Sequence, residues 1–159
     1  MTSSGFDPQP GPLGGSYSSH TEPGGLGARF LARLIDGIIV GIVGSIVVFA
    51  LQLQSNIMVT GLFTGLLTFV YFVAFEVTQG WTPGKKLLGL SVHGPAGAAK
   101  PDARQSAIRN AFTVLTIIPF VGGLLAFIAI IVIAVTINGS PTKQGKHDEL
   151  AGGTQVVKG

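Results

Sequence analysis

Hydrophobic and polar positions divide the chain into long apolar runs separated by short polar segments. Residues 37–75 contain no charged side chain. About 20 residues cross the hydrocarbon core of a bilayer, so this run is too long for one crossing. A polar group interrupts it in the middle: Gln52, Gln54, Ser55 and Asn56. The pattern predicts a helical hairpin with membrane spans over about residues 31–52 and 58–78.

A second uncharged stretch covers residues 110–142 and is broken at residues 119–123 by proline and glycine. It predicts a segment over 104–118, short or re-entrant, and a span over 121–138 that is just long enough to cross. We expect these two pieces to form a second hairpin, and three plain crossings are the alternative. The predicted fold is therefore an all-α polytopic membrane bundle with three or four membrane segments.

Basic residues border the apolar runs and indicate which way the chain lies in the membrane. Arg29 and Arg33 precede the first span, Lys85 follows the second, and Lys143 and Lys146 follow the last. Because loops rich in Lys and Arg stay on the cytoplasmic side, the N-terminus is expected to be cytoplasmic. The same rule places the C-terminus in the cytoplasm, which favours the second hairpin.

The first 25 residues are mostly proline, glycine and serine. Such a segment buries too little apolar surface to offset the entropy of ordering it, so a disordered tail is expected over 1–25. The membrane domain is expected over 26–157.

Composition narrows the range of functions. Only 11% of the residues are charged and the mean hydropathy is +0.56, whereas soluble domains carry about 25% charged residues. The chain has no cysteine, which excludes disulfides and thiolate metal sites. The net charge of +3 comes from few basic residues that flank apolar runs, so nucleic-acid binding is not expected. Without a catalytic constellation, metal-ligand spacing or cofactor loop, we expect neither an enzyme nor a cofactor.

A cluster of charged residues at the expected cytoplasmic end is the candidate site. Arg29, Arg33 and Asp36 have i, i+4, i+7 spacing and share one helix face. A carboxylate entering an apolar segment costs a few kcal/mol unless it is paired, so Asp36 requires partners. We expect basic groups to supply them. The predicted ion-pair or proton/cation-coupling cluster comprises Arg29, Arg33, Asp36, Glu76, Lys85, Arg109 and Asp148.

Four pieces together resemble the RDD family of bacterial membrane proteins, named for one arginine and two aspartates. The pieces are residues 29–36, 82–92, 108–110 and 147–157. The resemblance implies that the naming residues are Arg29 or Arg33, Asp36 and Asp148. Gly153 departs from the family pattern as an insertion before Thr154. The N-terminal extension is similar to those of actinobacterial members. The resemblance as a whole implies a multi-pass protein of the bacterial cell membrane.

Two functions follow as hypotheses. The resemblance implies a transport-related role, either cation/proton exchange or small-solute transport. The alternative is a non-transporting accessory or assembly protein of a membrane complex. Small residues along both predicted spans, among them Gly37, Gly41, Gly61 and Gly65, allow close helix packing. The expected partners are the lipid bilayer and either further copies of the chain or a larger membrane complex.

Overall fold

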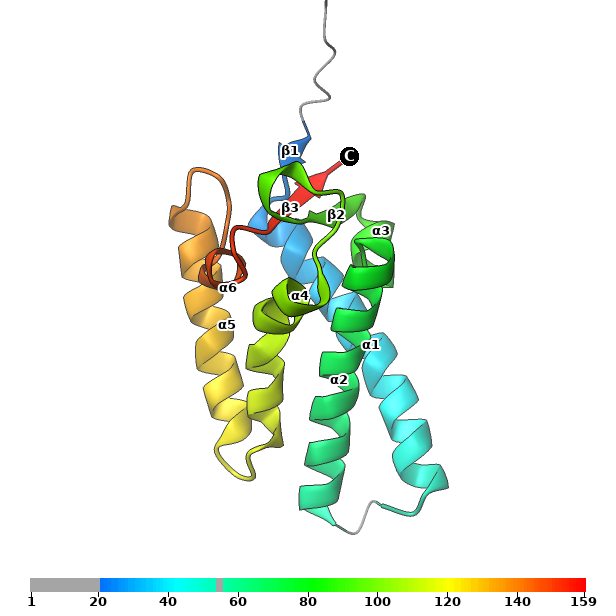
Figure 1. Cartoon of the computed structure of the whole chain (residues 1–159). Helices are drawn as coiled ribbons and strands as arrows, with labels where there is room; N and C mark the ends of the chain where they lie inside the picture. The colour runs from blue at the N-terminus through cyan, green and yellow to red at the C-terminus, as the bar shows by residue number, and fades with distance from the viewer. Residues whose placement is uncertain (1–20, 54–55) are drawn as a thin grey trace, which may run out of the picture.

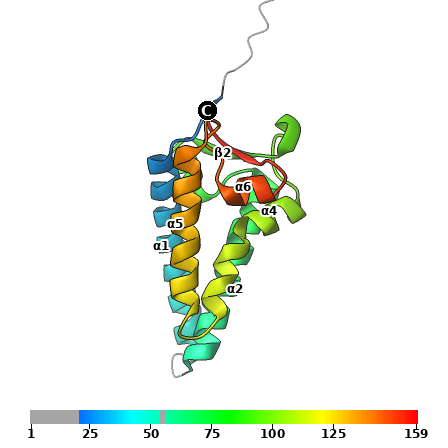
Figure 2. The same cartoon turned by 90° about the vertical axis from the view of Figure 1, so that its left-hand side faces the viewer.

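Two helical arms extend from a small cap in the computed structural model of the chain (Figure 1). The structure describes residues 21–53 and 56–159. Figures 1 and 2 agree that the sheet and the C-terminus lie at one end, whereas the last turn of α1 and the first turn of α2 lie at the other.

The first arm is a hairpin of two long helices, α1 (Leu26–Ala50) and α2 (Ile57–Gln79). Asn56 begins α2, because its side chain accepts hydrogen bonds from two backbone N–H groups of the first turn that lack helical partners. The helix ends at Gly80, whose φ of 74° is the left-handed conformation that glycine adopts without steric cost.

The second arm descends through α4 (Ala103–Asn110) and the 3₁₀ helix η2 (Ala111–Ile117) and returns through α5 (Gly122–Gly139). Asp102 and Gln105 form a capping box that begins α4. A 3₁₀ helix rises about 2.0 Å per residue against about 1.5 Å for an α-helix. The descending segment therefore reaches roughly 26 Å, close to the roughly 27 Å of α5.

The cap consists of short elements from both ends and the middle of the chain. A three-stranded antiparallel sheet has the order β1-β3-β2. Its strands are β1 (Glu22–Pro23), β2 (Leu90–His93) and β3 (Gln155–Lys158). The short helices α3 (Pro83–Leu87), η1 (Pro95–Gly97) and α6 (Lys146–Leu150) complete it. Leu90, Val92 and Val156 pack on Ala32 of α1 and form a small apolar core that ties the sheet to the first helix.

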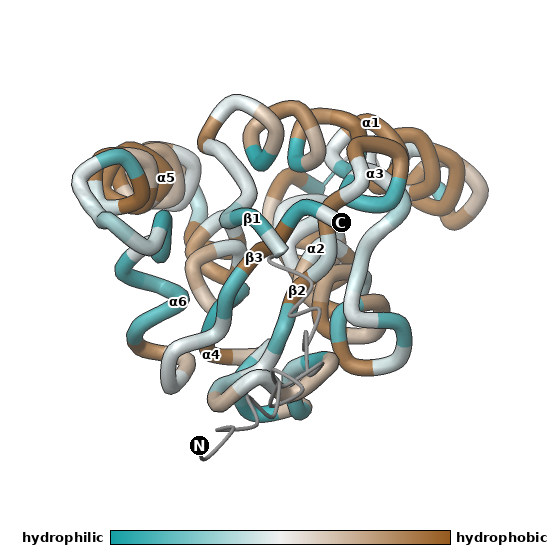
Figure 3. Tube along the Cα trace, turned by 90° about the horizontal axis from the view of Figure 1, so that it is seen from above, coloured by the Kyte–Doolittle hydropathy of each residue, from teal (hydrophilic) through white to brown (hydrophobic). Residues whose placement is uncertain are grey.

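Three helices, α1, α2 and α5, are long and apolar enough to cross a membrane. Large apolar side chains along them face outward, and Phe49 and Ile57 are about three-quarters exposed. Seen from above, α1 and α5 are predominantly hydrophobic and stand on opposite sides of the cap (Figure 3). These surfaces indicate a multi-pass protein in contact with lipid.

The predicted helical architecture is confirmed: the chain is mostly helical, and three spans match the expected ranges closely. The segment predicted over 104–118 is α4 and η2, which lead away from the cap, and α5 leads back to it, so the described ends of the chain meet at the cap. The sheet as a whole was not expected. Leu88, Leu90 and Val92 alternate with smaller or polar residues, which is typical of a short strand, and β2 lies there. The expected tail lies outside the described residues up to residue 20, and the expectation of disorder is wrong for Glu22 and Pro23, which pair with β3.

Candidate functional site

Asp36 lies fully buried on α1 and is surrounded by hydrogen-bond donors. Its Oδ1 accepts from the Tyr71 hydroxyl at 2.8 Å and from the backbone N–H of Gly84 at 2.8 Å. Its Oδ2 accepts from the Thr82 hydroxyl at 2.5 Å. Three charge-assisted hydrogen bonds therefore join α1 to α2 and α3.

The segment 82–85 places two hydrogen-bond donors at the Asp36 carboxylate. The Thr82 side chain accepts the backbone N–H of Lys85 as the N-cap of α3, and Pro83 occupies the first turn, where its missing N–H costs nothing. A Cβ on Gly84 would collide with the carbonyl oxygen of Ala32 and with the Asp36 carboxyl group. Only glycine therefore lets the backbone approach α1 closely enough to donate.

The expectation that arginines neutralise Asp36 is wrong. Within the described parts of the chain, no Lys, Arg or His nitrogen lies within 4.0 Å of its carboxylate. The physical reason is that the start of α3 supplies an amide and a hydroxyl at the position where an arginine would otherwise be needed. Arg29 and Arg33 point to other partners.

Glu76 is the second buried acid and lies near the end of α2 with no exposed surface. Its Oε1 forms ion pairs with Lys85 and, at 3.4 Å, with Nε of Arg109. Its Oε2 accepts from Ser106 at 2.9 Å and from the Asn110 amide at 3.0 Å. Glu76 thus fastens α2 to both α3 and α4.

Asp148 is the third buried acid and lies on α6 of the cap. Its Oδ1 pairs with Arg109 and accepts from Thr154 at 3.2 Å. Its Oδ2 pairs with Arg29 at 3.0 Å and accepts the backbone N–H of Gly145 at 3.1 Å. Arg109, only 4% exposed, therefore bridges Glu76 and Asp148 and connects the two ion-pair networks.

The pKa values of the groups outside the membrane spans follow from these contacts. Burial alone would raise the pKa of Asp148, but Arg109, His147 and Arg29 outweigh it and lower the pKa to about 2. Burial alone would lower the pKa of Arg109, but Asp148 and Glu76 raise it above its ordinary value. Burial lowers the pKa of Lys85 to about 8 despite the opposing effect of Glu76. Asp148 and Arg109 therefore stay ionised at neutral pH, and Lys85 stays mostly protonated.

Arg33 differs from the other cationic residues of the cluster. Its Nη1 donates to the Asn110 side-chain oxygen at 3.2 Å, and its guanidinium lies over the rings of Phe72 at 3.7 Å and Phe112 at 4.7 Å. In the part of the chain that the structure describes, no carboxylate oxygen lies within 4.0 Å of it. Arg33 therefore has only neutral partners.

The structure thus brings five of the seven candidate residues into one ion-pair network: Arg29, Glu76, Lys85, Arg109 and Asp148. Asp36 and Arg33 lie beside it without an ion pair. A role in ion coupling stays a prediction for all seven. Sequence reasoning missed the neutral donors Tyr71, Thr82, Gly84, Ser106, Asn110 and Thr154. The one available signal was that all of them except Tyr71 and Ser106 lie in the segments that carry the family resemblance.

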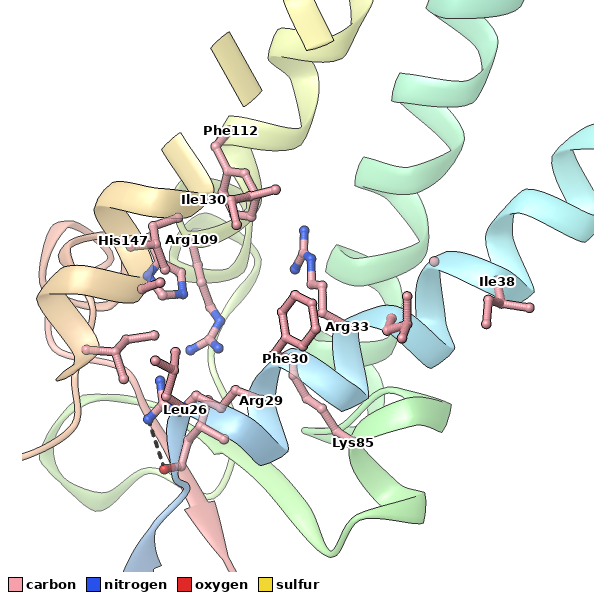
Figure 4. A pocket seen from close by; sticks show the side chains of 16 residues that line it. Leu26, Arg29, Phe30, Arg33, Ile38, Lys85, Arg109, Phe112, Ile130 and His147 are labelled. Atoms are coloured by element: carbon pink, nitrogen blue, oxygen red, sulfur yellow. Dashed lines mark hydrogen bonds between the residues drawn. The ribbon is translucent and has the colours of Figure 1, made fainter. Parts of the chain in front are cut away.

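Two cavities adjoin the cluster. The first, of about 420 Å³, lies between α1 and α5, and Arg29, Arg33, Lys85 and Arg109 are among its lining residues (Figure 4). The second, of about 490 Å³, lies between α2 and the second arm and carries threonines, among them Thr64 and Thr116. Neither cavity is lined by a carboxylate. Over the described residues, no group of His, Asp and Glu side chains is arranged to hold a metal ion.

Comparison with known proteins yields one match. The sequence model of the RDD family matches residues 23–152, which covers the membrane arms, most of the cap and all seven candidate residues. No curated protein and no solved structure matches the chain.

Proposed function

The chain belongs to the RDD family, and from this premise and the geometry of the site we propose that it is a non-transporting accessory or assembly protein of a membrane complex. In this proposal the charged cluster fastens the cap to the membrane helices. The outward apolar faces of α1, α2 and α5 are then available for lipid and for other membrane proteins.

The observation that carries the proposal is that each buried acid has a complete set of donors from the chain itself. Asp36 has three, and Glu76 and Asp148 each have four. A coupling carboxylate must release its proton or counter-ion to a pathway, and such a group normally faces a water-filled cavity. Here both cavities are lined by Arg33 and by no acid, so their charge disfavours cations.

Transport of a cation, proton or small solute is the second candidate. One observation favours it: the two cavities share Arg33, Phe112 and Ile130, so they adjoin along the second arm. A rearrangement of these three side chains would join the cavities into one continuous space.

The experiment that separates the two functions measures ion flux. Purified protein in proteoliposomes should show no cation-dependent pH change in sodium, potassium or proton gradients. A saturable pH change that Asp36→Asn abolishes would overturn the proposal and favour exchange.

Assembly is tested by extracting the membrane with a polymer that keeps the surrounding lipid. The protein should be recovered together with a second membrane protein at fixed stoichiometry. Recovery as a single chain alone would contradict an assembly role.

We also propose that the cap faces the cytoplasm of a bacterial cell, because the basic residues at the span ends gather at the cap end of the molecule. A reporter fused after Gly159 should then register as cytoplasmic. An external signal would refute this orientation.

A further inference from the structure

The guanidinium of Arg33 is partly buried and makes no direct ion pair within the described residues. It is held by two aromatic faces and one amide oxygen, all neutral. Cation–π contacts offset part of the cost of partly removing this charge from water. Because Arg33 also lines a cavity, an anion that enters the cavity can reach it directly.

The cavity between α1 and α5 gives access to Arg33. In Figure 4 the side chains of Arg33 and Arg109 reach into the space between α1 and the second arm. Four cationic side chains line this cavity and no carboxylate does. Arg29, Lys85 and Arg109 each pair with Glu76 or Asp148, whereas Arg33 pairs with neither of these acids.

The remaining walls of the cavity are apolar and continue into the lipid-facing surface. On α1 the wall consists of Phe30, Leu34 and Ile38, which share one helix face and are each at least half exposed. On α5 it includes Ile130 and Ile133. Such walls suit hydrocarbon and offer little to a small hydrated anion.

The depth of Arg33 matches a lipid headgroup. It lies seven residues into α1, roughly 10 Å along the helix from its start at the cap. This is the region where the polar cap meets the apolar spans, and basic pockets between membrane helices at that level bind anionic headgroups.

We propose that this cavity is a binding site for an anionic phospholipid, with its phosphate at Arg33 and an acyl chain between the apolar walls of α1 and α5. The headgroup supplies the direct ion-pair partner that Arg33 lacks within the described chain. A helix of a second copy seated in the same groove would bring apolar side chains but no anion. The inference is independent of whether the protein transports anything.

Native mass spectrometry of protein released from bilayers of equal parts phosphatidylglycerol and phosphatidylcholine tests the site. Wild-type protein should retain phosphatidylglycerol in preference to phosphatidylcholine. Arg33→Gln should weaken phosphatidylglycerol retention about tenfold or more, the effect of losing one charge-assisted hydrogen bond, and leave phosphatidylcholine unchanged. The control Arg104→Gln removes an exposed charge outside the cavity and should keep the preference.

A second pair of variants tests the cavity without touching the charge. Ala134 lines the cavity on α5, whereas its neighbour Val135 is 65% exposed and does not line it. Ala134→Phe should displace the lipid, and Val135→Phe should not. Equal retention of both lipids by the wild type, or an unchanged preference in Arg33→Gln or Ala134→Phe, would overturn the proposal. Displacement of phosphatidylglycerol by millimolar inorganic phosphate would overturn the lipid as the source of the anion.

Discussion

The backbone N–H of Gly84 donates to Oδ1 of Asp36 over 2.8 Å, and no side chain fits between the two residues. This contact replaces the ion pair that an acid at the base of a membrane helix would otherwise need. It also explains why a proline and a glycine follow Thr82: the first begins a short helix and the second allows that helix to touch α1.

Gly84→Ala tests this close approach. The added Cβ would overlap the Ala32 carbonyl oxygen, so α3 must shift and lose its hydrogen bond to Asp36. We expect a loss of about 3 kcal/mol in unfolding free energy, at the upper end of overpacking effects. The control is Gly37→Ala on α1, where no atom lies within 4 Å of the new Cβ. Its stability should be unchanged or raised by up to about 1 kcal/mol. Equal effects of the two variants in thermal unfolding would refute the steric argument.

Asp36→Asn tests whether neutral donors or arginines stabilise the Asp36 carboxylate. The hydroxyls of Tyr71 and Thr82 can rotate and accept from the new amide, so only part of the network is lost. The expected cost is about 2 kcal/mol, within the range for hydrogen bonds to a charged group. Tyr71→Phe removes one donor and should cost about 1.5 kcal/mol, the lower end of the range for a hydrogen bond to a charged group, because Tyr71 is only partly buried. If arginines neutralised Asp36, its removal would cost about 3–5 kcal/mol, the penalty for breaking a buried ion pair. Denaturation in detergent distinguishes these values.

The sequence was sufficient to predict the long helices, because their length and uncharged composition allow few alternatives in a membrane protein. It was also sufficient to predict that four charged residues lie in one cluster: Glu76, Lys85, Arg109 and Asp148. Charged residues that border apolar spans on one side of a membrane share one layer and need partners.

The pairing within that layer could not be predicted in the same way. Arg29 and Asp36 share a helix face, but they lie roughly 10 Å apart along the axis, so they meet different elements. Arg29 reaches Asp148 of the cap, whereas Asp36 meets α3. The role of Tyr71 depends on the crossing of α1 and α2, which no local pattern records. Strands β1 and β3 have two and four residues, too short for a reliable alternation.

His147 makes the stability of the cap sensitive to acid. Burial is the main cause that lowers its pKa to about 3, with Arg109 as the next, against an ordinary value of 6.5. The folded state therefore binds this proton less readily than the unfolded state, and stability is lost as the pH falls from about 6.5 toward 3. The slope should approach about 1.4 kcal/mol per pH unit.

His147→Gln should remove most of this slope between pH 6 and pH 4. Above pH 7 the variant should follow the wild type, since neither side chain changes its charge there. Thermal unfolding at a series of pH values measures both. An undiminished slope in the variant would show that another group binds the proton.

The central claim is that the buried ion pairs fasten the cap to the membrane helices. A comparison of substitutions at the buried Asp148 and at its exposed neighbour Glu149 tests this claim. Asp148→Asn leaves Arg29 without a carboxylate and Arg109 with Glu76 alone, and it should cost about 3–5 kcal/mol. Glu149→Gln removes the same charge from a half-exposed pair with Lys146 and should cost less than about 1 kcal/mol.

Amide hydrogen exchange of α6 and β3 in the two variants is the most direct measurement. The account predicts that Asp148→Asn loses protection throughout the cap while α2 and α5 stay protected, and that Glu149→Gln exchanges like the wild type. Unchanged protection of the cap in Asp148→Asn would contradict it.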